Sequence, residues 1–93
     1  MAGDWTFLTN HAHVLVFLST HPDARVRDLA EAVGVTERSV MAILGDLEEG
    51  GYVTRTRVGR RNEYRIDPQL TFRHPAEASQ PVGKLLAIFS RRD

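Results

Sequence analysis

Residues 27–51 read RDLAEAVGVTERSVMAILGDLEEGG, two short amphipathic segments separated by a glycine. The first segment, residues 27–35, is predicted to be a helix that ends at Gly34, because glycine tolerates the left-handed backbone that such an ending needs. Thr36 follows as an N-cap residue for the second helix, and Glu37 puts a negative charge on the positive end of that helix. Two apolar faces that meet across so short a turn predict a helix-turn-helix.

The second helix of this pair runs to about Glu49, where two glycines stop it. Its residues Val40, Leu44 and Leu47 recur at four- and three-residue spacing, which predicts an inward apolar stripe with Ile43 at its flank. The remaining positions face outward: Glu37, Arg38, Met41, Ala42, Gly45, Asp46, Glu48 and Glu49, with Ser39 at the edge. A helix-turn-helix holds its second helix outward in this way for a DNA groove.

A basic hairpin follows the two helices. Residues 52–57 and 62–66 are rich in β-branched and aromatic residues, which predicts two short strands. Gly59 lies between them and supplies the positive φ that a tight hairpin loop requires. Alternation along the second strand places Tyr64 and Ile66 on one face and their charged neighbours on the other.

A further helix precedes the pair, over about residues 11–20, with Thr9 or Asn10 as its cap. Its residues 14–18 are almost continuously apolar, and a helix that is apolar around most of its circumference is covered on most sides. Val26 is expected to add one short strand to the sheet of the hairpin.

The chain is long enough for one domain only. We assign residues 1–67 to the helix-turn-helix and hairpin, residues 68–81 to a connecting loop, and residues 82–90 to a short C-terminal helix. About ten residues are too few for a stable isolated helix, so its apolar stripe must pack on something. Two partners remain open: the 11–20 helix of the same chain, or the same elements of a second copy. The second copy is favoured because the first helix is so uniformly apolar.

The charge of the chain is unevenly distributed, although its formal total is zero. Residues 1–50 hold three arginines against eight acidic residues, a net charge of −5. Residues 51–93 hold nine basic residues against four acidic ones, a net charge of +5. Because this asymmetry creates a local field that the total hides, contacts with phosphate are expected mainly from the second half.

The sequence also argues against other classes of function. It contains no cysteine, which excludes disulfides and thiolate-bound zinc, and the spacing of His11 and His13 does not suit a metal site. No serine has a histidine–acid pair nearby and no glycine run forms a phosphate loop, so we expect neither enzymatic activity nor a cofactor. No apolar run approaches 18 residues and no secretion signal is visible, so we expect a soluble, cytoplasmic protein without a membrane partner.

Residues 33–53, VGVTERSVMAILGDLEEGGYV, resemble the signature of winged helix-turn-helix regulators, most closely those of the MarR and ArsR types. Residues 58–65, VGRRNEYR, resemble their wing, and residues 5–11, WTFLTNH, are similar to the start of small stand-alone members. The likeness covers about residues 5–66 and is most specific over 26–66. It implies an α+β, mostly α fold: a winged helix-turn-helix with a three-helix core and a β-hairpin wing, plus the short C-terminal helix.

The resemblance also implies where DNA would lie, with the third helix in the major groove and the wing tip at the adjacent minor groove or backbone. Carried over by position, the candidates on the third helix are Thr36, Arg38, Ser39, Met41, Ala42 and Gly45. The candidates on the hairpin are Arg55, Arg57, Arg60 and Arg61, the last two at the tip. Methionine, alanine and glycine side chains cannot hydrogen-bond a base edge, although the first two can touch a thymine methyl group.

Several candidates have a second possible role. The hairpin arginines, Arg65 included, could pair with acids of the third helix instead of DNA. Arg38 could contact guanine, or it could help to hold Asp46 eight residues on. The hydroxyl of Thr36 is expected to cap its helix, which leaves the backbone N–H as its phosphate contact.

Together these observations predict a homodimeric transcriptional regulator that binds double-stranded DNA, chiefly through phosphate contacts. The alternative is a winged-helix module for protein–protein interaction without sequence-specific DNA binding. The acidic surface of small residues around Met41, Ala42 and Gly45 favours that alternative. Nothing in the sequence identifies an operator or a small-molecule effector.

Overall fold

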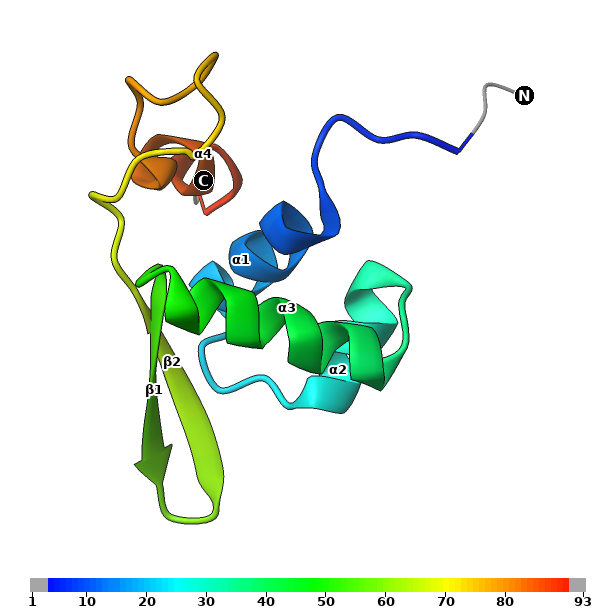
Figure 1. The fold of residues 1–93 in the computed structure, drawn as a ribbon. Helices are drawn as coiled ribbons and strands as arrows, with labels where there is room; N and C mark the ends of the chain where they lie inside the picture. Colours follow the sequence, from blue (N-terminus) through cyan, green and yellow to red (C-terminus); the bar gives the residue numbers. More distant parts are fainter. Residues whose placement is uncertain (1–3, 91–93) are drawn as a thin grey trace.

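The computed structural model describes residues 4–90, which form four helices and one two-stranded antiparallel sheet (Figure 1). The elements follow in the order α1 Asn10–Thr20, α2 Val26–Val33, α3 Glu37–Glu49, β1 Val53–Val58, β2 Arg61–Ile66 and α4 Val82–Phe89. This arrangement confirms the expected fold class, a mostly helical α+β fold with a three-helix core, a hairpin wing and a short C-terminal helix. Within the described residues, no helix has the length and hydrophobicity needed to cross a membrane.

The turn between α2 and α3 has the predicted glycine and threonine geometry. Gly34 has a φ of 85°, and its amide donates to the Ala30 carbonyl at 2.8 Å, which ends α2 in the left-handed conformation. The hydroxyl of Thr36 accepts from the Ser39 amide at 3.0 Å and begins α3. Because local hydrogen bonds close both helix ends, the turn fixes the direction of α3 relative to α2.

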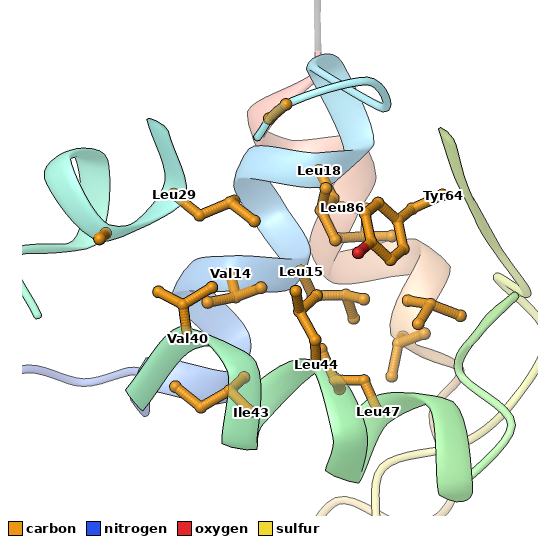
Figure 2. Close-up of a cluster of buried hydrophobic side chains, with 14 residues drawn as sticks. Val14, Leu15, Leu18, Leu29, Val40, Ile43, Leu44, Leu47, Tyr64 and Leu86 are labelled. Atoms are coloured by element: carbon orange, nitrogen blue, oxygen red, sulfur yellow. The ribbon is translucent and has the colours of Figure 1, made fainter. Parts of the chain in front are cut away.

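The core lies where α1, α2 and α3 meet, and the predicted stripe of α3 forms one wall of it. The stripe residues Val40, Ile43, Leu44 and Leu47 are all buried. In Figure 2 the stripe points toward the side chains of α1, among them Val14 and Leu15. Since this side of α3 is buried, its opposite side faces outward.

The hairpin pairs β1 with β2 in antiparallel register from Val53 opposite Ile66 to Val58 opposite Arg61. Gly59, with a φ of 62°, occupies the first central position of the turn, as in two-residue type II′ hairpins. Only the root of the hairpin is anchored in the core, through buried Val53 and Tyr64. The rest projects away from the helices (Figure 1).

The expectation of a strand at Val26 is wrong. Val26 is the first residue of α2, and the sheet has two strands. The connection from α1 to α2 instead makes a single backbone hydrogen bond to the hairpin, from the Tyr64 amide to the Pro22 carbonyl at 2.8 Å. Because Val26 already belongs to α2, the contact with the hairpin comes from residues 21–25, which connect α1 to α2.

The C-terminal helix α4 packs on α1 of the same chain. Val82 and Leu86 enter the common core, and the preceding segment folds back through an amide–carbonyl bond of 2.9 Å from Gly83 to Pro68. The other side of α4 remains open: Ile88 is 64% exposed and Phe89 is 51% exposed. In the described part of the chain, α4 therefore covers one side of α1 and presents apolar groups of its own.

Candidate nucleic-acid interface

The outward side of α3 is open to solvent at every candidate position. All six candidates from this element and its cap are exposed: Thr36, Arg38, Ser39, Met41, Ala42 and Gly45. Met41 is 63% exposed, which is unusual for a methionine, a residue type that is most often buried. A Cβ added at Gly45 would meet no atom within 4 Å, so the backbone of α3 can approach a partner closely at this point.

These residues offer both apolar and charged contacts. Met41, Ala42 and Gly45 form a shallow apolar strip without side-chain hydrogen-bond donors. Within residues 4–90, no ion pair involves Arg38, so its guanidinium is available near the positive end of α3. Thr36 and Ser39 are engaged with each other, because the Thr36 hydroxyl donates to Oγ of Ser39 at 3.0 Å.

Two acids beside this strip are paired with neighbouring elements. Oδ2 of Asp46 lies 2.8 Å from Nε2 of His11 on α1. Asp46 therefore pairs with a histidine of α1 and not with Arg38. Oε2 of Glu48 lies 3.8 Å from Nε of Arg55 on β1. For Arg55, the structure therefore shows the second role considered above, in which a hairpin arginine pairs with an acid of the third helix.

The four candidate arginines of the hairpin lie in different surroundings. Arg55 faces Glu48, and Nε of Arg57 donates to the Gly59 carbonyl at 3.2 Å. Arg60 is exposed in the turn, and none of the ion pairs within residues 4–90 involves it. A terminal nitrogen of Arg61 donates to the backbone carbonyl of Asp23 at 2.7 Å. Arg60 is therefore the tip arginine that is free to meet a ligand, while Arg61 is turned back toward the helices.

Sequence reasoning did not identify His11 and Asp23 as parts of this surface. Each is a partner in a contact that spans more than thirty positions, 35 for His11 with Asp46 and 38 for Asp23 with Arg61. No local pattern marks either residue, since periodicity and capping rules extend only over a few positions. For Asp23 alone, the uneven charge of the two halves was an available signal, because it favours acid–arginine pairs between them.

Tyr64 anchors the root of the hairpin. Burial raises the pKa of its hydroxyl above the usual 10.0, an effect that nearby Arg55 partly offsets. The neutral phenol is thus the form that the fold favours. Within residues 4–90, no cluster of three or more histidine or acidic side chains could hold a metal ion.

Comparison with protein families matches the part of the chain that contains α3 and the hairpin turn. A sequence model of the MarR family matches residues 6–61, which include α1, the helix-turn-helix and β1 with the hairpin turn. No curated protein gives a significant match to the chain.

Proposed function

The chain belongs to the MarR family of DNA-binding transcription regulators, and we propose that it places α3 in the major groove of a duplex. Its hairpin would then lie against the adjoining backbone or minor groove. The observation that carries this proposal is the open outward side of α3 beside a projecting hairpin whose turn presents Arg60. One domain thus offers a groove-sized helix and a cation to the same polyanion.

The proposed contacts divide into two kinds. Phosphate contacts come from Arg60 at the hairpin turn and from the backbone N–H at the start of α3, where the helix dipole is positive. Base contacts come from Arg38, with Met41 and Ala42 placed to touch thymine methyl groups. Because few side chains of α3 can hydrogen-bond a base, phosphate contacts dominate the affinity, and sequence preference is modest.

We also propose that the protein acts as a homodimer. Trp5 and Phe7, which stack edge to face, are 71% and 92% exposed, and Ile88 and Phe89 add to the exposed apolar groups. Exposed large apolar groups of this kind favour association with a second subunit. In this account residues 1–67 are the DNA-binding unit, and residues 82–90 contribute to the subunit contact along α1.

A gel-shift or anisotropy titration with genomic duplex fragments at low and moderate salt tests the DNA-binding proposal. We expect binding that weakens steeply as salt rises, because each neutralised phosphate contributes roughly 0.9 to the slope of log K against log salt. Arg60→Ala should flatten that slope by about 1.8 in a dimer, since one contact is lost from each hairpin. Arg73→Ala removes the same charge from the connecting segment beside α4 and should leave the slope unchanged.

A protein-binding role is the second candidate, and exposed Met41 with its small neighbours is the observation that favours it. An apolar strip flanked by acids suits a protein partner as well as it suits thymine methyl groups. Absence of any retarded duplex at low salt, where the charge of the hairpin is least screened, would favour this role over DNA binding.

A further inference from the structure

Two hydrogen bonds tie β2 to the connection between α1 and α2. The Tyr64 amide donates to the Pro22 carbonyl at 2.8 Å, and the guanidinium of Arg61 donates to the Asp23 carbonyl at 2.7 Å. The carboxylate of Asp23 lies 3.7 Å from the same guanidinium. In Figure 1 this connection, drawn in cyan, passes beside β2.

The position of these bonds matters because the hairpin has little other support. Residues 54–60 are exposed, and only Val53 and Tyr64 at the root are buried. An isolated two-stranded ribbon is marginally stable and free to bend. Arg61 lies at the end of β2 next to the turn, three residues before the buried Tyr64. Its hydrogen bond joins this end of β2 to the connection between α1 and α2.

The chemistry of the Arg61 contact suits a structural tie. Its principal acceptor is the backbone carbonyl of Asp23. This group is held in place by the chain, and it is neutral at every pH. Hydrogen bonds from a charged donor are about twice as strong as neutral ones. The adjacent Arg60 makes no such contact within the described residues, although it is the same type of residue and the immediate neighbour of Arg61 in the sequence.

We propose that Arg61 is a positioning residue that fixes the direction of the hairpin relative to α3, and that Arg60 alone of the pair contacts phosphate. The consequence for DNA rests on the proposed function. The tie itself is a property of the free protein, so it can be tested without any ligand.

Hydrogen exchange of the Tyr64 amide, followed by NMR in the free protein, measures the tie. Arg61→Ala should speed this exchange about tenfold or more relative to a core amide of α3, because the hairpin then opens more readily from the Pro22 carbonyl. Arg60→Ala is the matched control and should leave the exchange unchanged. Asp23→Asn keeps the backbone acceptor and should change the exchange little. Arg61→Lys keeps the charge without the planar guanidinium and should speed the exchange less than Arg61→Ala but more than Arg60→Ala, which keeps the tie testable if Arg61→Ala does not fold.

Duplex binding supplies the second readout. Arg61→Ala should lower the affinity while leaving the slope of log K against log salt unchanged, and Arg61→Lys should recover part of the loss. Arg60→Ala should reduce the slope itself.

Two results would overturn the positioning role. One is unchanged Tyr64 exchange in folded Arg61→Ala; the other is a slope reduced as much by Arg61→Ala as by Arg60→Ala. If instead the wild-type protein binds no duplex, the proposed function fails, while the exchange data still decide whether Arg61 holds the hairpin.

Discussion

Nε2 of His11 on α1 lies 2.8 Å from Oδ2 of Asp46 on α3, so the first turn of one helix is joined to the outward side of the other. Both side chains are about half exposed, which limits the contribution of the pair to stability to roughly 0.2–1 kcal/mol. Its larger effect is electrostatic. The pair holds a carboxylate beside the surface that we propose for DNA.

Replacing Asp46 tests that electrostatic effect. Asp46→Asn removes one negative charge next to the proposed phosphate path and should strengthen duplex binding by roughly two- to fivefold at low salt, with less gain at high salt. Anisotropy titrations at two ionic strengths measure this. Glu77→Gln removes the same charge from the connecting segment and should have no effect. Equal or weaker binding by Asp46→Asn would place the carboxylate away from the duplex.

Two glycines of the helix-turn-helix should respond in opposite ways to the same substitution. Gly34→Ala forces a side chain into a φ of 85° and should lower the free energy of unfolding by about 1–2 kcal/mol. Gly45→Ala adds a Cβ to an exposed position within α3 that meets no other atom, and should raise this free energy by up to about 1 kcal/mol. Urea unfolding of both variants checks the prediction. A destabilised Gly45→Ala would show that α3 needs glycine for a structural reason.

Alkaline pH should destabilise the protein through Tyr64. Because burial raises the pKa of this phenol in the folded state above 10.0, the unfolded chain loses the proton first. The stabilisation is therefore fully present below about pH 10 and is lost as the pH rises through the folded-state pKa. Urea unfolding between pH 9 and 11 should show this fall in wild type and a smaller one in Tyr64→Phe. Identical pH dependence in the two proteins would contradict it.

The fold was predictable because its signals are local. The glycine ending of α2, the threonine cap of α3 and the spacing of Val40, Leu44 and Leu47 each lie within a few positions, and each is present in the structure. Val26 was misassigned because three-stranded wings often recruit a residue pair from this position, whereas here Val26 is the first residue of α2. The backbone bond at Pro22, which no side-chain pattern encodes, takes the place of the expected strand.

The surface was less predictable because its differences arise from distant contacts. Arg60 and Arg61 have the same chemistry and adjacent positions, and only the folded path of the α1–α2 connection separates their contacts. Likewise, the sequence of α4 is compatible with packing on α1 of the same chain or on α1 of a second copy. In the structure, α4 packs on α1 of the same chain and buries Val82 and Leu86 in the core.

We propose above all that α3 and the hairpin meet one duplex together. Amide chemical-shift mapping of the protein with a duplex selected from a random pool tests it most directly. We expect simultaneous shifts for residues 36–45 of the α3 face and for Gly59 and Arg60 at the hairpin turn, with little change in the connecting segment at residues 73–79. Shifts confined to α4 and the Trp5–Phe7 segment, with α3 and the turn unchanged, would contradict it.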